Sequence, residues 1–445
     1  MKERVLLVGI STRALAESAV RAGYSVLSVD GYGDLDNPAT PALSLARDYG
    51  MEYSAHAAAV AAARLELEYD AVCPCSTFEN HPRDVELLAR RAELWGNPPA
   101  VLRRARDPVR LSRLLRSTLG AGALVRASAP APHGRGRASD AMRSSFRDSS
   151  RASSRAGAAG VEWLAKPRAS GGGHGISAWQ PGDALPRTHI LQERIAGTPG
   201  SIAFVAHDGN ALPFAISRQL VGDAAFGATA FQYCGSILSD RPRALIDAAT
   251  ECAQLLTEEL TLVGLACLDF VARDGVPHAI ELNPRYSSSM ELAERAFDFS
   301  VFEAHARACR RLSASTTATA ALATTLRSAG AFGKAILFAP HDLTMGDTRP
   351  WLADPDVRDV PHPGETIPRG HPVCTIFATA RDDAACYEML VRKAGGMYGS
   401  NSMRKQKAES REQGNSGVHE TGFRRQGSGF RKHPEIRHPR ASRDP

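Results

Sequence analysis

The chain has 445 residues, of which 43% are hydrophobic and 23% are charged, and its formal net charge is +6. A chain of this length exceeds what one hydrophobic core supports, so we expect two or three packed units. No stretch approaches the roughly 18 apolar residues of a membrane helix, and the first ten residues lack a signal-peptide pattern, so we expect a cytoplasmic protein. Residues 396–445 hold eleven Lys and Arg against five Asp and Glu, which accounts for the net charge and argues against a nucleic-acid-binding surface elsewhere.

The first 120 residues alternate short apolar runs with helical patterns. Apolar runs at 5–8 and 26–30 flank a helical pattern at 13–22, and a later run at 69–73 leads into a loop at 74–82. Strand–helix–strand crossovers of this length predict an open parallel sheet, and the loops at the carboxyl ends of such strands commonly bind ligands. We therefore predict an α/β domain over residues 1–120.

The rest of the sequence contains segments that differ in composition and in predicted structure. Residues 126–160 are mostly Ser, Arg, Ala, Gly and Pro, which indicates a flexible insertion within a domain at 121–330. Strand patterns at 263–271 and 278–282 flank Asp274 and Gly275, which predicts a hairpin. Strand patterns at 333–339 and 373–378 indicate a small β-unit over 331–394, and the polar residues 395–445 indicate a disordered basic tail.

A lysine at the end of a predicted strand precedes a glycine-rich loop. Lys166 is followed by Gly171, Gly172, Gly173 and Gly175. Glycines let backbone N–H groups surround phosphate oxygens, and a lysine supplies positive charge for them. The loop has neither the Gly-Lys-Ser/Thr of a P-loop nor the spacing of a dinucleotide turn, so a plain flexible loop remains an alternative.

Three oxygen-bearing side chains lie about a hundred residues later. Glu281 and Asn283 are two positions apart, so both leave the same face of a predicted strand. The hairpin turn brings Asp269 to the neighbouring strand, close to both. Two carboxylates and an amide suit Mg²⁺ carrying phosphates, whereas like charges this close destabilise a sheet that holds no cation. The alternative is a solvated, charged strand.

Together, the Lys166 loop and the set Asp269, Glu281, Asn283 and Arg285 resemble the ATP-grasp superfamily in order and spacing. The resemblance runs from the first strand to about residue 394. Residues 9–19 and 29–36 resemble the poorly characterised ATP-dependent carboligases related to biotin carboxylase. It implies an α/β and α+β chain: an N-terminal open parallel sheet, a two-subdomain ATP-grasp fold and a small C-terminal β-subdomain. It also implies that Lys166 binds ATP phosphates, that the acidic set binds Mg²⁺, and that Arg285 stabilises charge on the transferred phosphoryl group.

The resemblance extends to the adenine-binding strand of that family. Gln192, Glu193, Arg194 and Ile195 occupy its place, the first two facing the adenine amino group and the others offering backbone atoms. Pro199 falls where many relatives carry a ribose-binding glutamate, which leaves ribose contact open.

Further residues match regions near the phosphate and the acceptor in relatives. Arg218 is either a phosphate clamp or a solvated strand end. Glu79 and Asn80 either hold an ammonium or amide of the acceptor or cap a helix. Relatives often carry a second nucleotide lysine after an aspartate near the end of the first domain; here Asp107 precedes a proline, and Arg110 is either a substitute or a surface residue.

The resemblance implies an ATP- and Mg²⁺-dependent carboxylate–amine ligase that forms an acyl phosphate from small-molecule substrates, without nucleic-acid or membrane partners. By family analogy alone, we expect the enzyme to add glutamate or a similar amino acid in methanofuran- or tetrahydromethanopterin-type cofactor synthesis. The resemblance is also compatible with a homodimer. Three alternatives remain: a biotin-carboxylase-like carboxylase, a dinucleotide-dependent dehydrogenase using the loop at Gly9, and a non-catalytic ATP-binding module.

Overall fold

The computed structural model describes residues 3–120, 125–127, 161–312, 330–400 and 402–403. The N-terminal part is a five-stranded parallel sheet in the order β3-β2-β1-β4-β5. Its elements are β1 (Arg4–Gly9), α1 (Arg13–Arg21), β2 (Ser25–Asp30), β3 (Ala42–Ser44), α2 (Leu45–Tyr49), α3 (Ala55–Ala63), β4 (Ala71–Pro74), the 3-10 helix η1 (Phe78–Asn80), α4 (Pro82–Leu88), β5 (Glu93–Leu94), α5 (Pro99–Ala105) and α6 (Pro108–Leu119). The predicted open parallel sheet is confirmed.

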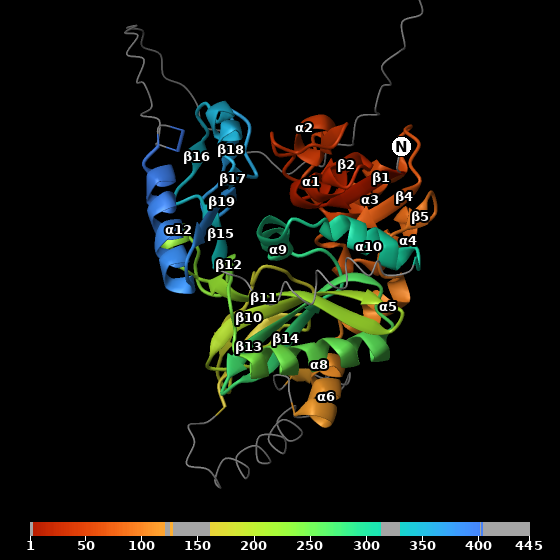
Figure 1. The fold of residues 1–445 in the computed structure, drawn as a ribbon, viewed down its shortest axis with the longest axis vertical. Helices are drawn as coiled ribbons and strands as arrows, with labels where there is room; N and C mark the ends of the chain where they lie inside the picture. Colours follow the sequence, from red (N-terminus) through yellow and green to blue (C-terminus); the bar gives the residue numbers. More distant parts are fainter. Residues whose placement is uncertain (1–2, 121–124, 128–160, 313–329, 401, 404–445) are drawn as a thin grey trace, which may run out of the picture. The chain divides into compact units, whose positions relative to one another are not determined.

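The central strand β1 is buried on both faces, which explains its unbroken apolar sequence. Leu6 and Val8 pack in one hydrophobic cluster with residues of α3, while Val5 and Leu7 pack in another with residues of α1 and α10 (Val301–Cys309). Helices therefore cover both faces of this sheet (Figure 1). The carboxyl end of β4 leads directly into η1, which carries Glu79 and Asn80.

Two further sheets follow. A small antiparallel sheet has the order β6-β9-β7-β8, and a larger one has the order β14-β13-β10-β11-β12-β15-β19-β17. Their strands are β6 (Val125–Ala127), β7 (Trp163–Pro167), β8 (Ser177–Trp179), β9 (His189–Glu193), β10 (Thr198–His207), β11 (Asn210–Val221), β12 (Tyr233–Leu238), β13 (Gly264–Arg273), β14 (Val276–Asn283), β15 (Ala331–Phe338), β17 (Val357–Arg358) and β19 (Pro372–Ala380). The first residues of the predicted insertion, 126–127, belong to β6, and residues 128–160 lie outside the described part of the chain.

The larger sheet is covered differently on its two faces. Helix α8 (Arg243–Leu260) packs against β10, β11 and β14 on one face, through residues such as Ile202, Phe204 and Leu282. Helices α9 (Met290–Phe297) and α10 lie on the other face (Figure 1). Side chains of successive residues on these strands therefore alternate, one pointing towards α8 and the next towards α9 and α10.

The C-terminal strands of the predicted small β-unit join the large sheet. β15 pairs with β12 in an antiparallel register that places Ile237 opposite Gly333, so the large sheet continues across the predicted boundary at 330. A two-stranded sheet of β16 (Leu343–Thr344) and β18 (Thr366–Ile367), the 3-10 helix η3 (Arg349–Ala353) and α12 (Asp383–Tyr398) complete this region, and the 3-10 helix η2 (Ala224–Phe226) contacts α12.

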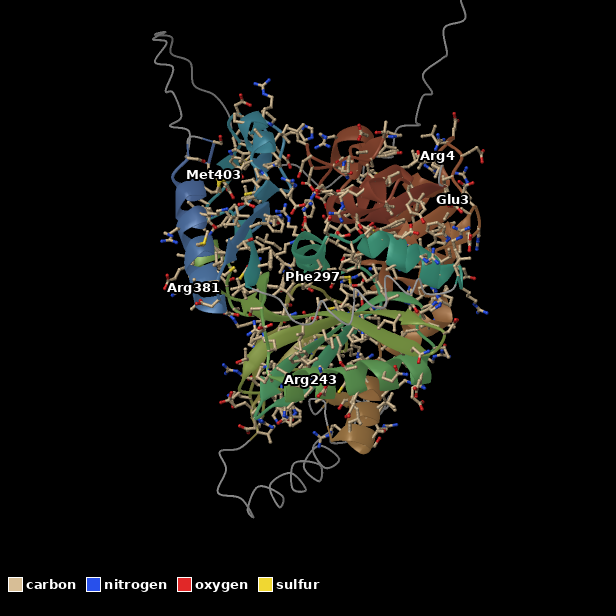
Figure 2. All side chains as sticks on the ribbon, in the orientation of Figure 1. Glu3, Arg4, Arg243, Phe297, Arg381 and Met403 are labelled. Carbon is tan, nitrogen blue, oxygen red and sulfur yellow. The ribbon has the colours of Figure 1, made fainter. Side chains whose placement is uncertain are left out.

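The predicted start of the tail at residue 395 lies inside a helix. α12 continues to Tyr398, whose hydroxyl donates to the carbonyl oxygen of Phe338. Met403, labelled in Figure 2, is 3% exposed and packs in the same hydrophobic cluster as α12. The chain therefore contributes to this core as far as Met403.

Candidate active site between the two central sheets

The site is built on the β13–β14 hairpin. Its turn lies at Asp274 and Gly275, which both adopt positive φ angles, of 53° and 79°. The turn pairs Arg273 with Val276 and Phe270 with Ala279, and a β-bulge between Asp269 and Phe270 then shifts the register, so that Asp269 lies directly opposite Glu281. The Asn283 amide donates to Asp269 Oδ2 over 2.8 Å. The predicted convergence of these three side chains is thus present in the structure.

Glu281 is held between two cations from distant parts of the chain. Lys166 Nζ lies 2.8 Å from its Oε2, and Arg106 Nη1 lies 2.8 Å from its Oε1. Lys166 comes from β7 of the small sheet, and it also donates to the Ile280 carbonyl over 3.3 Å. The small and large sheets therefore meet at Glu281, beside a pocket that Arg106, Lys166 and Glu281 help to line.

The two opposed carboxyl groups are in different electrostatic states. Burial and the nearby charge of Glu281 raise the pKa of Asp269 to about 7. Burial also opposes ionisation of Glu281, but Lys166 and Arg106 outweigh it and lower the pKa of Glu281 to about 2. Gln219 donates to Asp269 Oδ1 over 2.7 Å, so both Asp269 oxygens accept amide hydrogen bonds.

This set of oxygen atoms has the composition that a divalent cation takes, and in this structure each of the oxygens accepts from a neighbouring N–H that the cation would have to replace. Asp269, Glu281 and Asn283 offer two carboxylates and an amide oxygen, the ligands that Mg²⁺ takes together with phosphates. Burial, together with the nearby charge of Glu281, disfavours the ionised form of Asp269, and an added positive charge would stabilise that form. Within the described residues no group of three or more His, Cys, Asp or Glu side chains suits a metal, so this site depends on its amide.

Arg285 and the η1 residues lie next to this cluster. Arg285 Nη2 lies 2.7 Å from Glu79 Oε1 and 3.4 Å from Asn283 Oδ1. Asn80 Oδ1 accepts from Arg106 Nε over 2.9 Å. The sequence interpretation left Glu79 and Asn80 between acceptor binding and helix capping; neither side chain caps α4, and both contact cations of the site.

The glycine-rich loop is fixed at two points. Gly172 O accepts from Tyr233 N over 3.0 Å, and Ser170 O accepts from Arg106 Nη2 over 3.2 Å. Gly173 adopts a φ of 79°, and a Cβ there would lie 1.8 Å from the Phe231 carbonyl oxygen, so only glycine fits. Gly171, Gly172, Gly173 and Gly175 thus follow Lys166 in a loop that starts beside Arg106.

The predicted adenine-binding strand is the end of β9. The Gln192 side chain is buried and donates to the Ile280 carbonyl over 3.0 Å, next to the contact that Lys166 makes. Arg194 donates its backbone N–H to Glu162 O over 2.9 Å and pairs with the Glu162 carboxylate over 3.1 Å. Glu193 is partly exposed at the strand end, and Ile195 is 8% exposed.

The structure places Arg218 away from this cluster, in contrast to the phosphate-clamp interpretation. Arg218 and Gln219 are neighbours on β11, so their side chains point to opposite faces, and it is Gln219 that reaches Asp269. Arg218 Nη2 instead lies 2.6 Å from Asp383 Oδ1 of α12, and Arg241 binds the other oxygen of Asp383 over 2.7 Å.

Sequence reasoning missed Arg106 and Gln219. It placed the habitual second cation after Asp107, but Asp107 caps α6 by accepting from the backbone of Val109 and Arg110. The cation that enters the site is the residue before it, Arg106. The signal that could have found it is a cation just before α6, where the first domain meets the β13–β14 hairpin.

The loop that follows Gly9 is held by the side chain of Asp30, at the end of β2. Asp30 Oδ2 accepts from Thr12 N and Thr12 Oγ1 at 2.7 and 2.6 Å, and Oδ1 accepts from Tyr32 N and Gly33 N, both at 2.7 Å. Both oxygens of this buried carboxylate therefore already serve the fold, where a dinucleotide site needs an acidic side chain for the ribose.

Comparisons with known proteins agree with this geometry. Residues 124–289 match the family model described as an ATP-grasp domain. No curated protein sequence matches the chain. Of the described residues, no helix has the length and apolar character needed to span a bilayer.

Solved structures share the fold over most of the chain. The biotin carboxylase domain of Hydrogenobacter thermophilus 2-oxoglutarate carboxylase, in complex with MgADP, ADP and bicarbonate, is 15% identical, with a TM-score of 0.61 and coverage of 88% of each chain. L-amino acid ligase from Bacillus licheniformis is 14% identical, with a TM-score of 0.61 and coverage of 89% of this chain and 97% of that one. Carboxyaminoimidazole ribonucleotide synthase from Aspergillus clavatus, complexed with ATP, is 15% identical, with a TM-score of 0.59 and coverage of 89% and 98%. The chain therefore has the fold of these enzymes, and its residues 124–289 match the model of the ATP-grasp domain.

Proposed function

We propose that the protein is an ATP-dependent ligase that joins a carboxylate to an amine through an acyl phosphate, releasing ADP and phosphate. One observation carries this proposal: Glu281 binds Lys166 of one sheet and Arg106 of the first domain, directly opposite Asp269. Cations and oxygen ligands gathered between two sheets suit a nucleotide triphosphate with its metal ion. The match to the ATP-grasp domain family supports the same assignment.

In this proposal each group has a defined task. Mg²⁺ would be held by Asp269, Glu281 and Asn283, and it supplies positive charge to the β- and γ-phosphates. Lys166 and the glycines 171, 172, 173 and 175 would bind the phosphates, and Arg106 adds a second cation that the sequence interpretation did not include. The β9 residues Gln192 and Glu193, with Arg194 and Ile195 directly after them, would line the adenine side.

The chemistry proceeds in two displacements. A carboxylate oxygen of the first substrate attacks the γ-phosphorus in line, and the bond to ADP breaks, giving an acyl phosphate. The amine nitrogen then attacks the acyl carbon, and phosphate leaves with the electron pair of the carbon–oxygen bond. Arg285, 3.4 Å from Asn283 and paired with Glu79, offsets negative charge on the transferred group.

Isotope transfer tests this proposal. A carboxylate substrate labelled with ¹⁸O should pass one label to the released phosphate during turnover, because its oxygen becomes the bridging atom of the acyl phosphate. The substrates are first identified by screening pools of ¹⁸O-labelled amino acids, combined with unlabelled small amines, for ADP release. Turnover that leaves phosphate unlabelled would contradict acyl-phosphate chemistry.

The finer assignment concerns the substrates. We propose that the activated carboxylate is glutamate or a similar amino acid, and that the reaction belongs to methanofuran- or tetrahydromethanopterin-type cofactor synthesis, with Glu79 and Asn80 on the acceptor side. The contacts of Glu79 with Arg285 and of Asn80 with Arg106 support an acceptor position next to the nucleotide. Labelled glutamate with amines of that cofactor class gives the direct assay.

A carboxylase related to biotin carboxylase is the second candidate, because structures of that class share the fold over 88% of the chain. A carboxylase needs bicarbonate as its activated carboxylate and a biotin-like acceptor. ADP release that requires bicarbonate and free biotin, and not an amine, would establish it. Nucleotide binding with no ADP release from any substrate pool would instead indicate a non-catalytic ATP-binding module.

A further inference from the structure

Glu281 has a cation on each of its two carboxylate oxygens. Arg106 Nη1 lies 2.8 Å from Oε1, and Lys166 Nζ lies 2.8 Å from Oε2. Paired metal ions in phosphate-handling sites lie about 4 Å apart, a spacing that a carboxylate spans when both of its oxygens are available. A metal ion that binds Glu281 must displace one of these side chains, so the number of ions that the site takes depends on which of them leaves.

The Arg106 guanidinium is firmly held. Arg106 ends α5 and Asp107 caps α6, which fixes the backbone between two helices. The guanidinium N–H groups donate to acceptors in η1, the glycine-rich loop and β14: Asn80 Oδ1 at 2.9 Å, the Ser170 carbonyl at 3.2 Å, Glu281 Oε1 at 2.8 Å, the Leu282 carbonyl at 2.9 Å and Asn283 Oδ1 at 3.2 Å. Displacement of this side chain would break all of these contacts together.

Lys166 is held by fewer contacts. Within the described residues its ammonium group donates to Glu281 Oε2 and, over a longer 3.3 Å, to the Ile280 carbonyl. A lysine also carries its charge on a flexible four-carbon stem, whereas the guanidinium of an arginine is a rigid planar fork. A triphosphate offers the ammonium group new oxygen acceptors. Lys166 is therefore the cation that moves to the nucleotide and leaves Oε2 to the metal.

Once this lysine has moved, the site has enough oxygen atoms for one Mg²⁺. Glu281 Oε2 is then available. At Asp269 the ion replaces an amide hydrogen bond, from Gln219 over 2.7 Å or from Asn283 over 2.8 Å. At Asn283 Oδ1 it replaces the long, 3.4 Å contact with Arg285. These are the ligands that the proposed function assigns to the metal.

A second ion would meet a site that is already occupied. It would have to bind Glu281 Oε1 and share Asn283 Oδ1, and Arg106 Nη1 donates to both of these oxygens. Because Mg²⁺ binds carboxylate oxygens at about 2.1 Å, an ion on Oε1 would also lie against the positive guanidinium and be repelled by it.

We propose that Arg106 stays on Glu281 when the nucleotide binds and takes the place of a second metal ion, so that the site holds a single Mg²⁺ per ATP. This inference rests on the proposed function, because it requires a bound metal–nucleotide complex. In this arrangement the guanidinium supplies fixed positive charge on one side of Glu281, and the metal supplies it on the other.

Electron paramagnetic resonance of Mn²⁺ counts the ions. Mn²⁺ prefers the same oxygen ligands as Mg²⁺, and it is titrated into full-length protein kept in excess over a non-hydrolysable ATP analogue. We expect about one bound Mn²⁺ per nucleotide in the wild type. In Arg106→Met the freed oxygen should admit another ion and raise the ratio to about two, and ions about 4 Å apart should give a spin-coupled spectrum. Two ions in the wild type, or one ion in an Arg106→Met variant that binds the nucleotide, would overturn the inference.

Further variants make the result specific. Arg106→Lys keeps a cation beside Glu281 and should stay at one ion per nucleotide. Arg243→Met and Glu86→Gln remove a positive and a negative charge at exposed residues of α8 and α4, and as controls they should also leave the ratio unchanged. If Arg106→Met fails to fold, the wild-type ratio decides.

The failure of this inference is distinguishable from the failure of the proposed function. Two ions per nucleotide in a protein that passes ¹⁸O to phosphate would overturn the inference alone. A protein whose Mn²⁺ binding does not depend on the nucleotide at all would overturn the proposed function, and this inference with it.

Discussion

Glu281 and Glu291 each lie between one lysine and one arginine, yet their surroundings differ. Glu281 lies 2.8 Å from both Lys166 and Arg106, at the edge of a pocket and opposite the second carboxyl group, Asp269. Glu291 lies 2.5 Å from Arg13 and 2.7 Å from Lys334, and all three side chains are at most 5% exposed.

The difference separates a binding site from a structural junction. Arg13 belongs to the N-terminal sheet region, Glu291 to α9 and Lys334 to β15, so the Glu291 group joins three segments. Its charges are matched within the protein, since Arg13 also binds Asp359 over 2.9 Å. A buried glutamate between two cations therefore does not by itself mark a site. The opposed carboxyl group and the adjoining pocket do.

The largest effect is expected at the Glu281 group. Lys166→Met and Glu281→Gln should each lower ATP turnover by about 100- to 1000-fold, the loss typical when one charge-stabilising group of an active site is removed. Steady-state ADP release measures this, with circular dichroism to confirm folding. Glu86→Gln serves as the control, and near-normal turnover in Lys166→Met would contradict the assignment.

Glu291→Gln should act on stability instead. It leaves Arg13 and Lys334 buried with one charge unmatched, which costs about 3 kcal/mol of unfolding free energy. Urea denaturation measures the loss, while ADP affinity measured below the transition should stay within about twofold of wild type. A stable variant that no longer binds ADP would make Glu291 part of the site and remove the contrast with Glu281.

Mg²⁺ affinity should depend on pH through Asp269. Its pKa of about 7 means that cation binding must displace a proton at lower pH, whereas Glu281, with a pKa of about 2, is already ionised. Affinity should therefore rise about tenfold per pH unit up to pH 7 and level off above it. Calorimetric titrations of Mg²⁺ with ADP measure this dependence, and Asp269→Asn should flatten it.

The raised pKa of Asp269 also determines how the unfolding free energy of the metal-free protein changes with pH. The protonated form of Asp269 is favoured in the folded state, so its contribution is complete below the unfolded pKa near 4 and is lost as pH rises through about 7. Glu294, whose pKa burial raises to about 7, contributes in the same direction. Mg²⁺ should restore the part of the stability that is lost when Asp269 ionises, but not the part due to Glu294. Equal stability with and without Mg²⁺ above pH 7 would argue against the metal site.

Arg218→Ala should have a small effect. The Arg218–Asp383 pair is 26% and 29% exposed, so its loss should cost no more than about 1 kcal/mol, and ATP turnover should stay within about twofold. Thermal unfolding and ADP release measure the two quantities. A large loss of turnover would support the interpretation of Arg218 as a phosphate clamp. It would also indicate that the contact with Asp383 breaks during the reaction.

The smallest effect is expected from deleting residues 406–445, and a longer deletion is the contrast. Removing residues 406–445 should leave turnover and unfolding free energy unchanged, whereas removing 396–445 also removes the buried Met403 and the Tyr398 hydrogen bond. The longer deletion should therefore lower the unfolding free energy by about 2–5 kcal/mol, as buried methionine truncations do. Equal stability of the two truncations would show that α12 ends its packing earlier.

Local pattern explains which parts of the site were predictable. Glu281 and Asn283 share a face because strand side chains alternate. The Asp274–Gly275 turn alone would pair Asp269 with Ile280, and the β-bulge between Asp269 and Phe270 that brings Asp269 opposite Glu281 does not follow from alternation. Arg218 and Gln219 are both polar, so alternation could not show which faces the site. Only the pairing of β11 with its neighbours decided in favour of Gln219.

Contacts between distant segments account for the rest. Arg106 reaches Glu281 from the end of α5, far away in the sequence, and no periodicity in either segment encodes that approach. The same reason applies at the predicted boundary at 330, where the large sheet continues because β12 pairs with β15 although α8, α9 and α10 lie between them in the chain. Parallel packing in the N-terminal sheet was predictable because its strands are buried on both faces and read as continuous apolar runs.

A crystal structure with Mg²⁺ and a non-hydrolysable ATP analogue tests the central assignment most directly. We expect the triphosphate between the two sheets, with Lys166 on its phosphates and Mg²⁺ on Asp269, Glu281 and Asn283. A nucleotide bound elsewhere, or bound here with the metal on other side chains, would contradict the assignment.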